Sequence, residues 1–193
     1  MSDKGSVIES ILELELNMFL NVRSEVPVSC QENPEAFRLH RRAQFTLWSE
    51  ETLRSYHNDL VDAEQQGRNL MTLKYARMEN LIPPLNENPI IDAIVEMALE
   101  AQRGMLLRYP NILSHGRPLE DNGSGSTSFT TYLRGELETY SDRTLELLHR
   151  DIRRSAERGE NWAVQTYTSL FRELGYTSLD EVEERLREKD GGL

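Results

Sequence analysis

The chain has 193 residues, of which 22 are lysine or arginine and 33 are aspartate or glutamate, and its formal net charge at pH 7 is −11. A surface this acidic argues against a nucleic-acid-binding protein, because affinity for the phosphate backbone depends on lysine and arginine. There is no secretory leader, no basic transit-like start and no apolar run near 18 residues, so we expect a cytoplasmic protein that does not engage a membrane.

Hydrophobic residues at helical spacing, separated by helix-capping residues, prolines and glycines, predict an all-α protein. No segment has the sustained alternation that is typical of a strand. The longest irregular segment is 110–126, which contains four glycines or prolines after Pro110 and is expected to be a mobile loop. The predicted helices cover about residues 6–22, 34–47, 50–66, 70–81, 89–107, 128–139, 142–158, 161–173 and 178–189.

The sequence also contains an internal repeat. Residues 48–78 match residues 140–170 at a constant offset of 92 without a gap, and a weaker match at an offset of 83 relates the first helix to residues 91–95. This offset is too long for a helical solenoid, whose units have about 30 to 50 residues. We therefore predict one helical domain, residues 1–193, in which pseudo-two-fold-related halves at about 6–82 and 89–174 form a single bundle, followed by a helix at about 178–189.

Most of the shared positions have a structural explanation. The serine and asparagine pairs suit helix N-caps, the glycine pair suits helix ends, and the leucine pair lies on a core face. The histidine pair borders that face, so it either meets at the pseudo-axis to bind a metal or titrate near neutral pH, or consists of boundary residues. The identical pairs are Ser49/Ser141, Thr52/Thr144, Leu53/Leu145, His57/His149, Asp59/Asp151, Gly67/Gly159, Asn69/Asn161 and Tyr75/Tyr167.

Several ionisable side chains stand where the helical periodicity calls for a hydrophobic residue. Glu15 lies at the centre of the apolar stripe of the first helix, and Arg41 and Gln44 share a face with Trp48 in the second. Glu136 occupies the place of Gln44 in the repeat. Buried charges are costly unless they are paired, so we predict that Arg41 pairs with Glu136 or Glu15. Such a pair is either an internal strut or the floor of a polar pocket.

The fourth helix carries Lys74 and Arg77 three residues apart, beside the core residue Tyr75. Their counterparts in the repeat are Thr166 and Ser169, so only the first half has these two cations. Together with Arg41 they would suit a carboxylate or a phosphate. The alternative is a solvated basic edge that pairs with nearby acids.

Signals for catalysis are weak. His149 forms the one Glu-x-x-His pair with Glu146, whereas a di-iron bundle uses two such pairs and further glutamates. The single cysteine, Cys30, excludes an internal disulfide and a multi-thiolate metal cluster, and it is a nucleophile only if its pKa is lowered. No phosphate-binding glycine loop, zinc-protease helix or serine elbow is present, and no cofactor is indicated.

The motifs of both halves resemble an uncharacterised prokaryotic family known as a domain of unknown function. The first half contributes Ser29-Cys30-Gln31, Gly67-Arg68-Asn69-Leu70 and Lys74-Tyr75-Ala76-Arg77-Met78, and the second half contributes Thr131 to Glu136 and Thr139-Tyr140-Ser141. The resemblance spans about residues 8–185. It implies a helical fold but no activity or ligand. One departure is Gly159-Glu160-Asn161-Trp162, where the family tends to repeat Gly-Arg-Asn-Leu.

Three functions are compatible with these features. The leading hypothesis is a protein that binds, and in one version transforms, a small anionic molecule between the halves, with 110–126 closing over the site. The second is an interaction or homodimerisation module with a large exposed apolar patch. The third is a metal-dependent oxidase that uses His57, Glu146 and His149. For the leading hypothesis the ligand-binding candidates are Arg41, Gln44, Trp48, Lys74, Tyr75, Arg77 and Tyr132, and the acid–base or nucleophile candidates are Glu15, Glu136 and Cys30.

Overall fold

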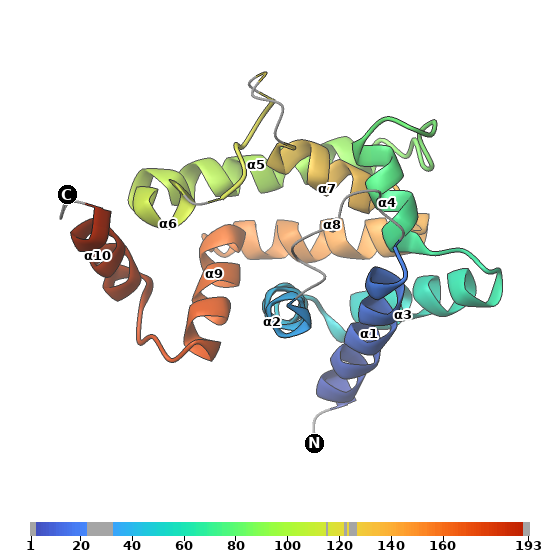
Figure 1. Cartoon of the computed structure of the whole chain (residues 1–193), viewed down its shortest axis with the longest axis horizontal. Helices are drawn as coiled ribbons and strands as arrows, with labels where there is room; N and C mark the ends of the chain where they lie inside the picture. Colours follow the sequence, from blue (N-terminus) through green and yellow to red (C-terminus); the bar gives the residue numbers. More distant parts are fainter. Residues whose placement is uncertain (1–2, 23–32, 115, 122, 124–126, 191–193) are drawn as a thin grey trace.

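The computed structural model describes residues 3–22, 33–114, 116–121, 123 and 127–190. Over these residues the chain forms ten α-helices and no strand, which confirms the all-α prediction (Figure 1). None of these helices is both long enough and apolar enough to cross a membrane. The helices are α1 (Asp3–Leu20), α2 (Pro34–Phe45), α3 (Glu50–Gln65), α4 (Leu70–Met78), α5 (Ile90–Arg108), α6 (Pro110–Ser114), α7 (Phe129–Leu137), α8 (Asp142–Glu157), α9 (Trp162–Glu173) and α10 (Leu179–Asp190).

The capping residues begin and end the helices where the sequence predicts. The hydroxyl of Ser49 accepts a hydrogen bond from Thr52 N at the start of α3, and Ser141 does the same for α8. The side chains of Asn69 and Asn161 cap α4 and α9. The glycines that follow α3 and α8 have φ values of +67° and +71°, which suit glycine because it has no Cβ.

Two helix boundaries differ from the prediction. α4 ends at Met78 rather than near residue 81, because Asn80 takes a left-handed conformation (φ 56°) and Leu81 N bonds back to Ala76 O at 2.8 Å. The segment 110–126 was expected to be irregular throughout, yet α6 occupies its first five residues. The carboxylate of Glu183 in α10 accepts hydrogen bonds from the backbone N–H groups of Asn111 and Ile112 at 2.9 and 3.0 Å. This tertiary contact stabilises a helix that is too short to form alone.

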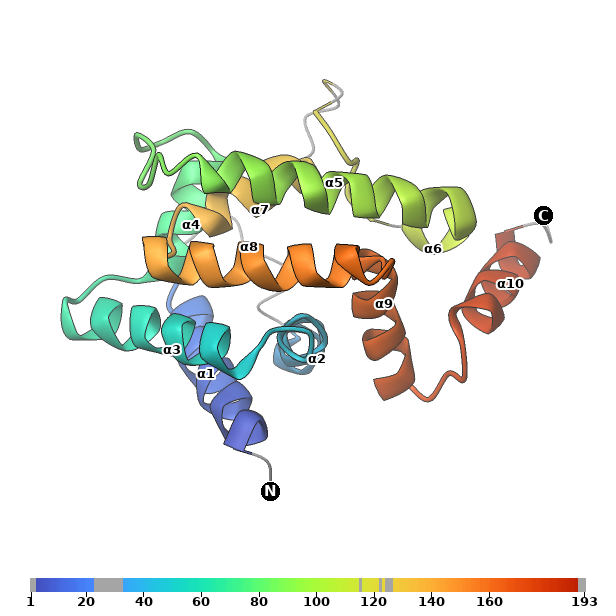
Figure 2. The ribbon, with the colours of Figure 1, turned by 180° about the vertical axis from the view of Figure 1, so that it is seen from behind.

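The helices pack in two corresponding sets. α1 contacts α2, α3 and α4, and α5 contacts α7, α8 and α9. Between the sets α3 lies against α8, α2 packs on α9 and α4 packs on α7. Figure 2 shows α5 and α8 lying side by side along the molecule, with α3 beyond α8. Helices from the first and the second part of the chain are therefore in direct contact at three places.

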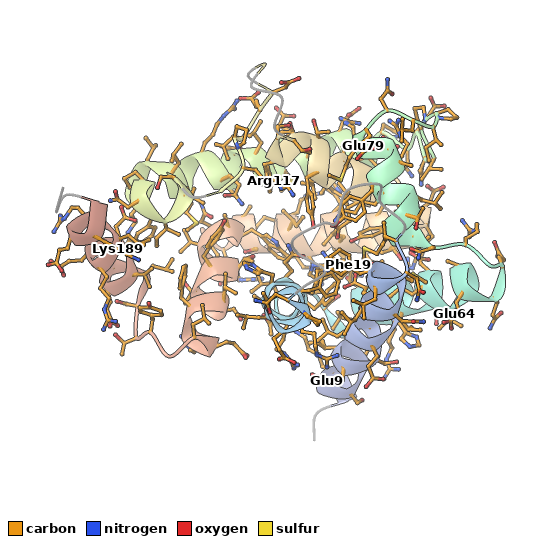
Figure 3. The ribbon with its side chains drawn as sticks, viewed as in Figure 1. Glu9, Phe19, Glu64, Glu79, Arg117 and Lys189 are labelled. Atoms are coloured by element: carbon orange, nitrogen blue, oxygen red, sulfur yellow. The ribbon has the colours of Figure 1, made fainter. Side chains whose placement is uncertain are left out.

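The main hydrophobic core fills the space between these helices. Its fully buried members include Ile11 and Leu12 of α1, Leu53 of α3, Ile94 of α5 and Leu145 of α8. In Figure 3 Phe19 lies among the side chains between the helices, whereas Glu64 and Lys189 lie at the periphery. A second, smaller core holds α10 against α6 and the end of α5, at the opposite end of the molecule from α1 (Figure 1). It consists of Met105, Tyr109, Ile112, Ala163, Leu179 and Val182.

Candidate functional site

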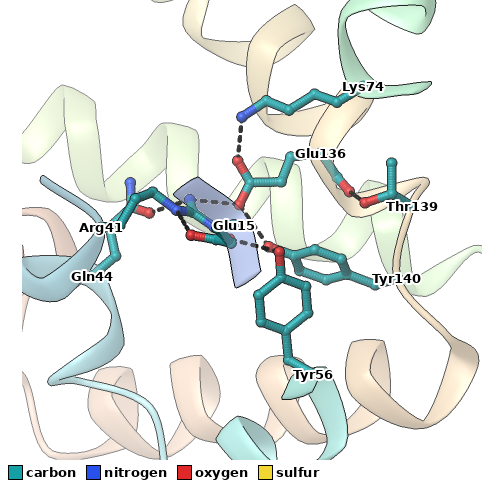
Figure 4. Close-up of polar contacts among 8 residues, drawn as sticks. All are labelled: Glu15, Arg41, Gln44, Tyr56, Lys74, Glu136, Thr139 and Tyr140. Carbon is teal, nitrogen blue, oxygen red and sulfur yellow. Dashed lines mark hydrogen bonds and ion pairs between the residues drawn. The ribbon is translucent and has the colours of Figure 1, made fainter. Parts of the chain in front are cut away.

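A network of buried charged side chains lies where α1, α2, α4 and α7 meet (Figure 4). Glu15 is fully buried, Arg41 and Lys74 are 3% exposed, and Glu136 is 6% exposed. The Arg41 guanidinium donates to both oxygens of Glu15, from Nε at 2.8 Å and from Nη2 at 2.5 Å, and its Nη1 donates to Glu136 Oε1 at 2.8 Å. Lys74 Nζ donates to Glu136 Oε2 at 2.6 Å. Two carboxylates thus balance two cations, and the predicted pairing of Arg41 is confirmed with both partners.

Three neutral side chains complete the network. Tyr56 OH donates to Glu15 Oε1 at 2.6 Å, and Tyr140 OH donates to Glu136 Oε1 at 2.6 Å. Gln44 Oε1 accepts from Arg41 Nη1 at 2.6 Å. The sequence indicated Gln44 as a site residue but neither of the two tyrosines. A buried tyrosine hydroxyl needs a polar partner, so a tyrosine on a core stripe is the signal that could have added them.

The charges in the network shift the pKa values of several of its members away from neutral pH. Burial opposes ionisation of the Glu136 carboxylate, but the positive charges of Arg41 and Lys74 outweigh it and hold its pKa well below the ordinary value. Burial likewise disfavours the charged form of Lys74, yet Glu136 raises the Lys74 pKa above normal. Burial, followed by the charge of Glu15, raises the pKa of Tyr56. The carboxylate of Glu136 is therefore ionised, and the hydroxyls of Tyr56 and Tyr140 are protonated, at neutral pH.

Arg77 and Tyr132 lie beside the network without joining it. The Arg77 guanidinium forms a two-point ion pair with Glu138 at 2.5 and 3.2 Å, and it also donates to the carbonyl of Ile82 at 2.7 Å. The Tyr132 ring lies 3.6 Å from Lys74 Nζ and 4.8 Å from the guanidinium carbon of Arg117. The three cations that the sequence assigned to an anionic ligand thus all have carboxylate partners within the chain.

The other candidates are dispersed. The ring of Trp48 packs edge-on against Phe45 and Tyr56, and the ring of Tyr75 lies 6.5 Å from that of Phe19. Both are core contacts. Cys30 lies outside the described residues.

The candidate metal ligands also have separate surroundings. His57 Nε2 lies 2.9 Å from the Ser10 hydroxyl, and Glu146 forms a long ion pair of 3.9 Å with Arg143. Within the described part of the chain, no three histidine, cysteine, aspartate or glutamate side chains gather as a metal site would require.

Residues 5–184 match a family model described as "Protein of unknown function (DUF4125)". The chain belongs to the DUF4125 family. This confirms the resemblance to a family of unknown function that its motifs indicated. No curated protein and no solved structure matches the chain significantly. A function for this DUF4125 protein is therefore argued from its own residues.

Among the clefts on the described part of the surface, we consider two, and neither is lined by Arg41, Lys74 or Arg77. The first, which we call the α3–α4 cleft, has a volume of about 290 Å³ and is lined by three carboxylates, Asp59, Asp62 and Glu138, and by one cation, Arg68. The second, the α1–α3 cleft, has a volume of about 380 Å³. Its lining residues are Ser6, Val7, Ser10, Arg54, His57 and Asn58.

The α1–α3 cleft is unlike the rest of this acidic molecule, because none of its lining residues is a carboxylic acid. Five of the six have a side chain that donates hydrogen bonds, and only Val7 is apolar. Sequence reasoning singled out His57 but missed Ser10 and Asn58, which look like ordinary exposed positions of a helix. The available signal was the difference between the halves, since Arg54 stands where the repeat has Glu146.

Proposed function

We propose that this protein binds a small anionic molecule in the α1–α3 cleft. The observation that carries the proposal is the lining of that cleft, which combines the guanidinium of Arg54, the imidazole of His57, the amide of Asn58 and two serine hydroxyls without any carboxylate. Several hydrogen-bond donors in one cleft, with no carboxylic acid among the lining residues, suit a carboxylate or phosphate group, although such a ligand would have to compete with Glu50 for Arg54. The ligand class is the one predicted from the sequence, but the proposed place is different.

The buried network is a weaker candidate for the same role. An anion there would have to displace Glu136 from Arg41 and Lys74, and breaking one side of a buried ion pair costs about 3–5 kcal/mol. Arg54 forms an ion pair with Glu50 at 2.9 Å, and both of these side chains are about half exposed. An exposed pair of this kind is worth about 0–1 kcal/mol, far less than a buried pair costs to break. The exposed guanidinium of Arg54 is therefore a better place for an anionic ligand than the buried cations Arg41 and Lys74.

We also infer that the two halves derive from one duplicated helical unit. Matched contacts at the two sequence offsets support this inference. Asn69 Nδ2 donates to Met18 O at 2.7 Å, and its counterpart Asn161 Nδ2 donates to Ala101 O at 2.9 Å.

Matched ion pairs and caps support the same duplication. Glu9 of α1 pairs with Arg42 of α2, and Asp92 of α5 pairs with Arg134 of α7. Asp59 accepts from Ser141 N at 3.1 Å, and its counterpart Asp151 accepts from Ser49 N at 2.8 Å. Each pair falls at the offset of 92 for the later helices and 83 for the first.

The proposed duplication allows the residues of the α1–α3 cleft to be compared with their counterparts in the second half. The histidine is kept in both halves, but Ser10 corresponds to Ala93, Arg54 to Glu146 and Asn58 to Arg150. The second half thus keeps the histidine and a donor at the place of Asn58, but it has no hydroxyl at the place of Ser10 and an acid at the place of Arg54. A binding site that arose after duplication would differ between the copies in this way.

The alternative of an interaction module has less support. It requires a large apolar patch, and the exposed large hydrophobic side chains among the described residues are spread over four segments: Leu20, Leu81 and Leu85, Leu106 and Leu107, and Leu174. A homodimer and a cytoplasmic location stay predictions, which light scattering and cell fractionation would test.

A thermal-shift titration with inorganic phosphate and with small dicarboxylates tests the proposal. A ligand present at 100 times its Kd stabilises the folded state by about 2.7 kcal/mol. For a chain of this size that corresponds to a rise in Tm of roughly 5–10 °C. No shift with any anion up to tens of millimolar would refute anion binding.

Arg54→Ala places the site within the molecule, and Arg153→Ala is the matched control. Arg153 also lies on an exposed helix face and pairs with an acid four residues away, at 3.1 Å. We expect R54A to abolish the anion-dependent shift and R153A to keep it. Equal shifts in the two variants would place the ligand elsewhere.

A further inference from the structure

From the pairing of Ser10 with His57 we infer that the α1–α3 cleft is also a site of acyl transfer, in which Ser10 is the nucleophile, His57 is the general base, and the substrate is a small ester that carries an anionic group. The inference rests on the proposed function, because anion binding would place the ester beside Ser10. Ser10 and His57 are not part of the buried network, and the description of the family gives no function for them.

The geometry supplies the two reacting groups. Ser10 Oγ lies 2.9 Å from His57 Nε2, within the 2.6–3.2 Å that proton transfer between a nucleophile and its base requires. Ser10 lies on α1 and His57 on α3, and these helices pack directly against each other. Both side chains are half-buried and line a cleft that admits a small molecule. The pair is held by two rigid elements but remains accessible.

The reaction balances with groups in the cleft. Ser10 Oγ attacks the ester carbonyl carbon while its proton moves to His57 Nε2. The carbon–oxygen bond to the alcohol then breaks, and His57 returns the proton to the departing oxygen, which leaves an acyl-serine. Water hydrolyses that ester by the same two proton transfers, so neither an oxidant nor a reductant is needed. Arg54 and Asn58 are the nearby donors for the negative charge that develops on the carbonyl oxygen.

The second half contains a natural comparison. His149 occupies the place of His57, but the position that corresponds to Ser10 at the offset of 83 is Ala93. The second histidine therefore has no hydroxyl at the corresponding place. If a histidine on this helix face were sufficient for reactivity, His149 would react as well, and it serves as the internal control.

The experiment uses the full chain and the mono-4-nitrophenyl ester of terephthalic acid, whose carboxylate cannot reach its own ester. We expect a burst of nitrophenolate equal to one acyl group per chain, which peptide mass spectrometry locates on Ser10. Ser10→Ala should abolish the burst, His57→Gln should slow it by about 100-fold or more, and His149→Gln should leave it unchanged. An acyl group on another residue, no burst, or an equal rate in His57→Gln would overturn the inference.

Further measurements exclude a purely structural explanation. Circular dichroism melts report whether each variant folds, and added imidazole should restore acylation in His57→Ala, which a structural role would not allow. If the variants do not fold, the residue that is acylated in the wild-type chain tests the inference, and an acyl group on any residue other than Ser10 rejects it. A phosphate-dependent thermal shift without acylation would reject this inference alone. Acylation of Ser10 by neutral nitrophenyl acetate without any anion-dependent shift would reject the proposed anion binding and the anionic substrate, but it would leave Ser10 and His57 as the reacting pair.

Discussion

Substitution of Glu136 by glutamine tests whether the buried network stabilises the folded protein. The carboxylate receives three hydrogen bonds, from Arg41 at 2.8 Å, from Lys74 at 2.6 Å and from Tyr140 at 2.6 Å. Glutamine has nearly the same shape but no charge, and its amide nitrogen would face a cation. Two buried cations would then share the single charge of Glu15. Removal of one partner of a buried pair costs about 3–5 kcal/mol, so we expect E136Q to lower Tm by roughly 6–20 °C.

The assay is thermal and urea unfolding followed by circular dichroism, with Glu157→Gln as the matched control. Glu157 is 61% exposed and pairs with an arginine four residues away. Its substitution should change the free energy of unfolding by less than about 0.5 kcal/mol. A loss below about 1 kcal/mol in E136Q would refute the strut. An increased affinity of E136Q for acetate would instead indicate that the network is a ligand site that Glu136 occupies.

Two further predictions concern the same region. The folded-state pKa of Glu136 lies below its ordinary value of 4.5, so its contribution to stability is fully present above that pH and is lost as the pH falls further. The acid side of a pH–stability curve, measured by urea unfolding, should therefore be shallower in E136Q than in the wild type; parallel curves would contradict the assignment. Gly135→Ala would place a Cβ 3.0 Å from Met78 Cγ and 3.2 Å from the backbone oxygen of Lys74, where α7 crosses α4, which we expect to cost about 1–3 kcal/mol. The control is Gly5→Ala in α1, which meets no atom within 4 Å and should gain roughly 0.5–1 kcal/mol; similar effects of the two changes on Tm would refute close packing at Gly135.

Local signals in the sequence predicted most of the fold. Ser49, Asn69 and Gly67 begin and end helices through contacts with residues a few positions away, so their roles can be read without the tertiary structure. The helix α6 was missed for the opposite reason. It depends on Glu183, which is about 70 residues later in the chain and caps its first turn. The sequence pattern of residues 110–114 alone cannot predict a contact with a residue so far along the chain.

The candidate site divides in the same way. A charge on an apolar stripe predicts burial and a partner, and Arg41, Glu15 and Glu136 satisfy that prediction. Whether these buried charges neutralise one another or leave a cation for a ligand depends on the distances between the side chains in the folded protein. The spacing of residues along the sequence does not give those distances. Lys74 is an example, because its position on α4 is compatible both with an internal ion pair and with a cation that is left for a ligand. The 2.6 Å contact between Lys74 Nζ and Glu136 Oε2 shows that it forms an internal ion pair.

The differences between the halves now point to two separate roles. Arg41, Lys74 and Glu136 differ from their counterparts, and together with Glu15 they form a neutral buried set whose change would cost several kcal/mol of stability. Arg54 differs as well, but its side chain is about half exposed, in an ion pair with Glu50. In a chain with a net charge of −11, an exposed cation in a cleft with no carboxylic acid among its lining residues suits an anionic ligand. The buried network holds α1, α2, α4 and α7 together, and the α1–α3 cleft is the place where we propose that binding be sought.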